Sequence, residues 1–173
     1  MDRRLFLTGA LALGGCASVP ASPTVATRPV TLDQAFVGRK RGAGVFRVWL
    51  TGEERRFRAH LDGRLSRSGA RLTVVEDFTY DDGQTDRLTW VFDRTGPGRW
   101  TGRREDTVGQ ATVVEENGEV RLAYTADFKS LSGVTRLGFE DVIYLRTDGV
   151  IVNDAVVSRA GFPVGSVRFE IRG

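Results

Sequence analysis

Apolar and polar residues alternate along most of the chain after residue 43. The clearest example is the stretch 72–92, in which two alternating arms flank an acidic segment at 81–86. The apolar side of the two arms is formed by Leu72, Val74, Phe78, Tyr80, Leu88, Trp90 and Phe92. A period of two residues is typical of a half-buried strand, and Gly83 suits a tight turn. The pattern therefore predicts a β-hairpin over this stretch.

Similar arms fill the rest of the chain. Glycine-containing turn segments lie at 95–98, 117–118 and 148–149. This spacing predicts about ten short antiparallel strands, and closing them into a barrel removes the two exposed edges of a meander. We therefore expect an all-β fold, an antiparallel up-and-down β-barrel that is lipocalin-like in being wide enough to hold one small ligand. The only helical segment expected is one turn at 31–36, with Thr31 or Asp33 as its N-cap.

The N-terminal segment predicts export and attachment to a membrane. Arg3 and Arg4 precede an apolar run at 5–14, which is too short to span a bilayer, and small residues then lead to Cys16. This arrangement resembles a bacterial lipobox, in which the cysteine thiol receives a lipid. Ala17 after the cysteine indicates the outer membrane, with the protein facing the periplasm. The alternative is a cleaved leader in which the cysteine is incidental.

Three regions follow from this interpretation. We expect a lipoprotein signal peptide at 1–15, read by the general or the twin-arginine export route. A lipidated Cys16 then begins a flexible tether at 16–30, rich in Ala, Ser, Thr and Pro. The barrel domain occupies 31–173.

The amino-acid composition limits the kinds of partner and site that the chain can have. The net charge of +3 is too small to indicate a nucleic-acid partner. Cys16 is the only cysteine, so no intramolecular disulfide can form, and His60 is the only histidine, which excludes a histidine-rich metal site. The Gly-x-Ser-x-Gly nucleophile motif is absent. We expect no cofactor and no metal, and we interpret the carboxylates at 81–86 as a solvated turn.

Two adjacent carboxylates interrupt an otherwise apolar strand. Because neighbouring residues of a strand point to opposite sides, either Glu140 or Asp141 faces inward. A buried carboxylate needs a partner, for which the chain offers Arg47, Arg104, Arg121 and Arg136. The inward carboxylate is either a contact for a ligand headgroup or half of a structural ion pair. The candidate cavity residues are Phe78, Tyr80, Trp90, Glu140, Asp141 and Tyr144.

Charged residues also predict a cross-strand ion pair and a basic surface, both on the outside of the barrel. Asp77 and Arg87 lie at equivalent distances from the turn at 81–86, which predicts a cross-strand pair; a register shifted by one residue pairs Glu76 with Arg87 instead. Basic residues concentrate near the tether, and they are Arg39, Lys40, Arg41, Arg55, Arg56 and Arg58. We expect Arg39, Lys40 and Arg41 to contact anionic lipid headgroups; the alternative is a solvated rim.

Several segments are similar to one bacterial family. They are EDFxYDDG at 76–83, DxVGQA at 106–111 and DVIYL at 141–145, within a resemblance that runs from about residue 36 to the C-terminus. The family is DUF3833, whose members are small lipoproteins of uncharacterised function with lipocalin-like architecture. The resemblance implies no catalytic residues, and it implies a fatty-acid or membrane-lipid context.

These observations lead to two main functional hypotheses. The first is a membrane-anchored periplasmic lipoprotein that binds an apolar ligand, a fatty acid or a membrane lipid, inside its barrel. The alternative is a structural or assembly-support lipoprotein with a filled core and no ligand. An enzyme is less favoured, because it would need carboxylates that converge in a cleft. An interior cavity would favour the first hypothesis over the second.

Overall fold

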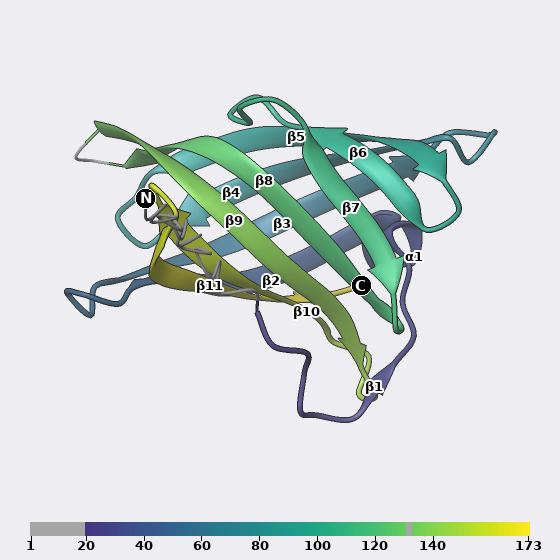
Figure 1. The fold of residues 1–173 in the computed structure, drawn as a ribbon, viewed down its shortest axis with the longest axis horizontal. Helices are drawn as coiled ribbons and strands as arrows, with labels where there is room; N and C mark the ends of the chain where they lie inside the picture. Colours follow the sequence, from purple (N-terminus) through teal and green to yellow (C-terminus); the bar gives the residue numbers. More distant parts are fainter. Residues whose placement is uncertain (1–19, 131–132) are drawn as a thin grey trace, which may run out of the picture.

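The computed structural model describes residues 20–130 and 133–173, so the expected signal peptide and Cys16 lie outside the described residues. The described chain forms one short helix and eleven strands (Figure 1). The elements are β1 (Thr27–Arg28), α1 (Leu32–Phe36), β2 (Gly38–Val48), β3 (Glu54–Leu65), β4 (Arg71–Tyr80), β5 (Thr85–Gly96), β6 (Arg99–Arg103), β7 (Ala111–Glu116), β8 (Glu119–Ser130), β9 (Gly133–Arg146), β10 (Ile151–Arg159) and β11 (Phe162–Arg172).

Ten of these strands close into a barrel. From β2 to β11 each strand pairs antiparallel with the next, and β11 returns to β2 with Gly165 opposite Val48 and Arg172 opposite Arg41. The predicted antiparallel up-and-down barrel of about ten strands is therefore confirmed. Closure leaves no free edge in this ring of strands. An open meander would have two such edges, which can pair with other chains.

The β4–β5 hairpin has the register that the apolar pattern predicts. Leu72 lies opposite Phe92 and Val74 lies opposite Trp90. Asp77 lies opposite Arg87, with Asp77 Oδ1 3.4 Å from Arg87 Nη1, so the first of the two predicted pairs is confirmed. Because Asp77 points outward, its neighbour Glu76 points into the barrel.

Helix α1 closes one end of the barrel. Leu32, Ala35 and Phe36 are buried there, and the backbone N–H of Leu32 donates a hydrogen bond to Glu115 Oε1 at 2.9 Å. Gly63 lies beneath the helix, and a Cβ at this position would be 1.8 Å from the carbonyl oxygen of Phe36. The predicted helical turn is present, and Thr31 is its N-cap. The loops β2–β3, β4–β5, β6–β7 and β10–β11 lie at the opposite end, which we call the mouth.

Residues 20–30, the described part of the expected tether, lie against the α1 end of the barrel. β1 extends β9 by pairing Thr27 with Arg146, and the N–H of Val30 donates to the carbonyl oxygen of Gly118 at 3.1 Å. Arg121 Nη2 donates to Ser22 Oγ at 3.0 Å. These contacts use backbone and polar groups, and Val30 at the end of the segment adds a buried apolar side chain to the core.

No helix in the described part of the chain combines the length and apolarity required to cross a membrane.

Candidate functional site

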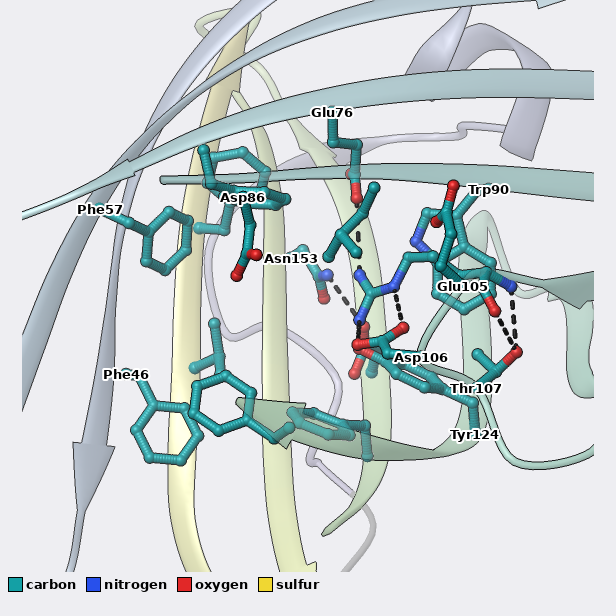
Figure 2. A pocket seen from close by; sticks show the side chains of 18 of the residues that line it. Phe46, Phe57, Glu76, Asp86, Trp90, Glu105, Asp106, Thr107, Tyr124 and Asn153 are labelled. Atoms are coloured by element: carbon teal, nitrogen blue, oxygen red, sulfur yellow. Dashed lines mark hydrogen bonds and ion pairs between the residues drawn. The ribbon is translucent and has the colours of Figure 1, made fainter. Parts of the chain in front are cut away.

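The barrel contains an interior cavity of about 320 Å³. Phe36 of α1 lies at its closed end, and Lys129 and the exposed Val134 lie at the mouth. Side chains from most strands of the barrel reach it (Figure 2). Its aromatic lining consists of Phe36, Phe46, Phe57, Phe78, Tyr80, Trp90, Phe92, Tyr124, Phe128, Phe139 and Phe169.

Aromatic rings pack against one another along the cavity wall. Near the mouth, the rings of Phe46 and Phe128 stack with centroids 5.4 Å apart. Deeper in the barrel, Tyr124 and Phe139 stack at 4.8 Å. Each such pair adds stability beyond its buried area, and the wall they form is apolar. The lining therefore suits the hydrocarbon part of a ligand.

A loop between β6 and β7 carries a charged group into this apolar interior. Thr107 Oγ1 donates to the carbonyl oxygen of Arg104 at 2.8 Å, and the N–H of Val108 donates to the carbonyl oxygen of Thr125 at 2.8 Å. The N–H of Asp127 donates to the carbonyl oxygen of Asp106 at 2.9 Å. These bonds hold the loop against β8, and in this conformation Arg104 lies inside the barrel.

Arg104 is the centre of a buried charge cluster. Its Nε and Nη2 donate to the two carboxylate oxygens of Asp106 at 2.7 and 2.9 Å, a bidentate arrangement. Its Nη1 lies 3.5 Å from Glu76 Oε2, and its guanidinium lies 4.8 Å from the ring centroid of Trp90. Burial opposes the charge, yet Tyr124, Asp106 and Glu76 raise the pKa of Arg104 above its usual value. The guanidinium therefore stays protonated.

Two carboxyl groups and an amide face the same space. Glu76 of β4, Asp106 of the β6–β7 loop and Asn153 of β10 lie close to one another inside the barrel (Figure 2). Asn153 Nδ2 donates to Asp141 Oδ2 at 2.9 Å. Burial raises the pKa of Glu76 to about 7, against the opposing effect of Arg104. Burial likewise raises the pKa of Asp141 to about 7, against the opposing effects of Asn153 and Arg104. Both groups therefore titrate near neutral pH.

Arg55 of β3 lies at the mouth of the barrel. Its Nε donates to Asp82 Oδ2 at 2.7 Å and its Nη2 donates to Gln84 Oε1 at 2.6 Å. The guanidinium lies 3.6 Å from the ring centroid of Tyr80. Burial and the nearby Asp86 raise the pKa of Tyr80 to about 12, so its hydroxyl stays neutral. These contacts tie the β4–β5 turn to β3 and form part of the rim of the cavity.

The structure places four of the six candidate cavity residues at the cavity, namely Phe78, Tyr80, Trp90 and Asp141. The placement of Glu140 and Tyr144 there is wrong. Asp141 faces inward, so strand alternation turns outward both Glu140, one position before it, and Tyr144, three positions after it. Tyr144 instead packs with Val142, Val150 and Val152 on the outer side of the barrel wall, where it is buried, and donates its hydroxyl to Asp154 Oδ2 at 2.9 Å.

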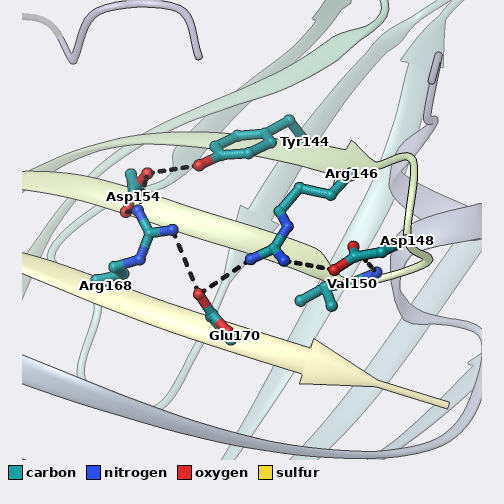
Figure 3. A network of polar contacts seen from close by, with 7 residues as sticks. All are labelled: Tyr144, Arg146, Asp148, Val150, Asp154, Arg168 and Glu170. Atoms are coloured by element: carbon teal, nitrogen blue, oxygen red, sulfur yellow. Dashed lines mark hydrogen bonds and ion pairs between the residues drawn. The ribbon is translucent and has the colours of Figure 1, made fainter. Parts of the chain in front are cut away.

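That outer contact belongs to a polar network across β9, β10 and β11 (Figure 3). Arg168 Nη1 lies 3.0 Å from Asp154 Oδ2, and Arg168 Nη2 donates to Glu170 Oε1 at 3.3 Å. Arg146 Nη1 donates to the same oxygen of Glu170 at 3.4 Å. The network joins the last three strands, beside the seam where β11 meets β2, and we assign it a structural role.

Sequence reasoning did not identify Glu76, Asp106 or Asn153 as site residues. A signal existed for Glu76, because it shares the alternating positions of Val74 and Phe78. Of the four arginines considered as partners for a buried carboxylate, only Arg104 lies in the cavity. The other three form ion pairs elsewhere: Arg47 with Glu54, Arg121 with Glu116 and Glu119, and Arg136 with Asp127.

Basic residues form a shallow groove on the outside of β11, β2 and β3. We call it the basic groove and define it by Arg41, Arg56, Arg58, Arg168 and Arg172; among the described residues, Glu170 is the only acidic one that lines it. Arg39 and Lys40 line a neighbouring hollow with His60 and Asp62. Arg55, which the sequence groups with these cations, turns toward the cavity instead.

Among the residues that the structure describes, no group of three or more His, Cys, Asp and Glu side chains is placed to hold a metal ion. The carboxylates at 81–86 make protein contacts instead. Asp81 Oδ2 accepts a hydrogen bond from the N–H of Arg56 at 3.1 Å, and Asp82 pairs with Arg55.

Comparisons with known proteins identify a family and a fold. The family model described as "Protein of unknown function (DUF3833)" matches residues 10–172. No curated protein matches the chain. Among solved structures, the S-type phycobiliprotein lyase CPES from Guillardia theta is similar, with a TM-score of 0.56 and 9% sequence identity over 79% of this chain and 86% of that chain. At this identity the likeness is one of fold alone.

Proposed function

The chain belongs to the DUF3833 family, and we propose that it binds an apolar ligand inside its β-barrel. The observation that carries the proposal is the aromatic cavity of about 320 Å³. Ligand pockets have volumes of roughly 300–1,000 Å³ and combine apolar walls with a few placed polar groups. The cluster around Arg104 supplies such groups. A filled core, as in the alternative structural hypothesis, would have no space of this kind.

The phycobiliprotein lyase of the same fold gives limited support. Its name assigns it a lyase activity on phycobiliproteins, and through the shared barrel it supports a role for this chain in handling a small molecule. The support extends no further than the fold.

The proposal includes a lipid anchor on Cys16 in the outer membrane and a ligand that is a fatty acid or the acyl part of a membrane lipid. The lipobox-like sequence before Cys16 supports the anchor. Pro20 accepts a hydrogen bond from Arg121 Nη1 at 3.5 Å near the α1 end of the barrel. Cys16 precedes Pro20 by four residues and can lie at most about 14 Å from it. The anchor would thus hold the α1 end toward the membrane and direct the mouth into the periplasm.

Binding can be tested with a neutral apolar fluorophore, diphenylhexatriene, and the full chain carrying Cys16→Ser, which needs no detergent. Val167 lines the cavity, so Val167→Trp fills part of it. Val156 on the neighbouring strand points outward, and Val156→Trp is the matched control. We expect Val167→Trp to weaken fluorophore binding at least about tenfold and the control to leave it unchanged. Equal binding by all three proteins would contradict an interior site.

A specific observation also favours contact with an anionic membrane surface. The basic groove brings five arginines together around one glutamate. Arg56 and Arg168 have carboxylate partners, in Glu54 and in Asp154 and Glu170. Arg41, Arg58 and Arg172 make no ion pair with any described residue. Cations that lack partners can bind phosphate headgroups, each contributing about 1 kcal/mol near a charged leaflet.

A further inference from the structure

Three polar atoms inside the cavity lack hydrogen-bond partners among the described residues. They are Glu76 Oε2, Asp141 Oδ1 and Asn153 Oδ1. Their side chains all line the cavity, and the residues Glu76 and Asp141 are 6% and 4% exposed. All three atoms are oxygens that accept hydrogen bonds when the carboxyl groups are ionised. Glu76 Oε2 lies at ion-pair distance from Arg104 Nη1, 3.5 Å, whereas Asp141 Oδ1 and Asn153 Oδ1 have no hydrogen-bond partner among the described residues. Buried polar groups normally have hydrogen bonds, so this part of the cavity offers unused accepting capacity.

The donors that surround these atoms are already engaged. Arg104 directs Nε and Nη2 to Asp106 and places Nη1 3.5 Å from Glu76 Oε2, and Asn153 directs its amide nitrogen to Asp141 Oδ2. The charges of the side chains that line the cavity lead to the same conclusion. Besides Asp127, whose carboxylate pairs with Arg136 on the outside, five carboxyl groups line the cavity, at Glu76, Asp86, Glu105, Asp106 and Asp141, against three cations, at Arg55, Arg104 and Lys129. The lining therefore becomes net negative as Glu76 and Asp141 ionise. A ligand with an anionic head would therefore meet a guanidinium that is already neutralised and an excess of negative charge.

Resting on the proposed function, we infer that the ligand presents a hydrogen-bond-donating head, and not a free carboxylate, to Glu76, Asp141 and Asn153. A protonated amine is the strongest such donor. An ammonium has three donors and no acceptor, which matches three acceptors around one space. Hydrogen bonds between charged donors and carboxylates are also about twice as strong as neutral ones. Within the ligand classes of the proposed function, this favours a lipid with an amino head over a free fatty acid.

The pH dependence of binding follows from the surroundings of the two carboxyl groups. Asp141 is influenced by Arg104 of the β6–β7 loop, by Glu76 of β4 and by Glu140 of its own strand, and it acts in turn on Tyr124 of β8. Glu76 is influenced by Arg104, Asp106 and Glu105. Both carboxyl groups have a pKa of about 7. A donor head favours their ionised forms, so binding releases protons and the affinity rises with pH; a carboxylate head has the opposite effect.

The test compares three ligands with the same hydrocarbon chain, namely dodecylamine, dodecanol and dodecanoate. Each is used to displace diphenylhexatriene from the full chain carrying Cys16→Ser. We expect dodecylamine to bind at least about tenfold more tightly than dodecanoate. Between about pH 6 and pH 8, where dodecylamine stays protonated, we expect its affinity to rise.

Two variants separate the headgroup from the cavity. Asp141→Asn replaces one acceptor oxygen by an amide, and we expect it to weaken dodecylamine binding much more than dodecanol binding, so that most of the preference for the amine is lost. Glu140→Gln changes the adjacent outward carboxyl group and should leave all three affinities unchanged. If dodecanol binds while the amine and the carboxylate bind equally, the headgroup inference is wrong and the proposed function stands. Displacement by none of the three overturns both. If Asp141→Asn does not fold, the pH dependence of the unsubstituted site decides: affinity for dodecylamine that is flat or falls with pH overturns the inference.

Discussion

Asn153 donates its amide hydrogen to Asp141 Oδ2 at 2.9 Å, from β10 to β9, and leaves Asp141 Oδ1 and Asn153 Oδ1 without a hydrogen-bond partner among the described residues. The bond fixes the orientation of both groups. A buried acceptor without a partner costs about 1–3 kcal/mol, and a fold retains such a group when it serves another purpose. We propose that in this barrel the purpose is the recognition of a ligand.

The buried carboxyl groups predict that stability falls as pH rises toward neutrality. The pKa of Asp141 is about 7 in the folded protein, against 3.8 for an unperturbed aspartate. Between these values the folded state binds the extra proton, so the free energy of unfolding decreases with increasing pH, by at most about 1.4 kcal/mol per pH unit for this group. Asp141→Asn removes the titration and should make the slope between about pH 5 and pH 7 shallower.

Urea unfolding of the full chain carrying Cys16→Ser, at several pH values, measures this slope. Asp127→Asn is the control, because Arg136 lowers the pKa of Asp127 and its titration falls below this pH range. A slope that Asp141→Asn leaves unchanged would mean that Asp141 is ionised throughout.

Arg104 and Arg136 form bidentate ion pairs of similar geometry in opposite environments. Arg104 pairs with Asp106 inside the barrel, and Arg136 pairs with Asp127 outside it at 2.8 and 3.0 Å. Arg104→Gln leaves Asp106 and Glu76 as buried charges without a cation, so we expect a loss of about 3–5 kcal/mol in the free energy of unfolding. Arg136→Gln removes an exposed pair and should cost less than about 1 kcal/mol. Denaturant titrations that give equal losses would contradict the burial of the Arg104 cluster.

Gly63 allows α1 to close the barrel. A Cβ at this position meets the backbone of Phe36, so Gly63→Ala must displace the helix. We expect Gly63→Ala to lower the free energy of unfolding by about 1–3 kcal/mol, as overpacking does. A Cβ added at Gly96 would meet no described atom within 4 Å, and Gly96→Ala should change stability by less than about 0.5 kcal/mol. Thermal unfolding distinguishes the two, and a neutral effect of Gly63→Ala would show that the contact of α1 with the barrel is loose.

The basic groove predicts binding to anionic membranes. Replacing Arg41, Arg58 and Arg172 together by glutamine removes three cations, each worth about 1 kcal/mol, and should weaken binding to vesicles that contain phosphatidylglycerol by about a hundredfold. The control replaces three exposed arginines outside the groove by glutamine, namely Arg64, Arg87 and Arg103. Because both variants lose the same charge, equal weakening would indicate an effect of net charge and not of the groove. Vesicles of phosphatidylcholine alone should bind none of the proteins.

Much of this barrel could be predicted from the alternation of apolar residues, because each strand has one face in the interior and one in water. The pattern located the β4–β5 hairpin and the pair between Asp77 and Arg87. It failed for the first half of β2, where Gly42 and Gly44 occupy inward positions. The rings of Phe169 and Phe57 fill the space that side chains at these glycines would need. A strand whose interior is filled by its neighbours has no apolar pattern of its own.

The candidate site was predictable only in part, for a similar reason. Alternation requires that Glu140 and Asp141 face opposite ways, but it does not decide which one faces inward. That choice depends on the register of β9 with β8, in which Asp141 lies opposite Leu122. Arg104 and Asp106 reach the interior from a loop, where no periodicity applies. Their position depends on hydrogen bonds to β8, which form only after the barrel has closed.

The central claim, that the barrel binds an apolar ligand, is tested most directly by native mass spectrometry of the protein purified from the cells that produce it. We expect a non-covalent adduct with the mass of a small amphiphile, present on the unsubstituted protein and on Val156→Trp and lost from Val167→Trp. A spectrum in which all three proteins have only the mass of the polypeptide, with or without a covalent lipid, would contradict it.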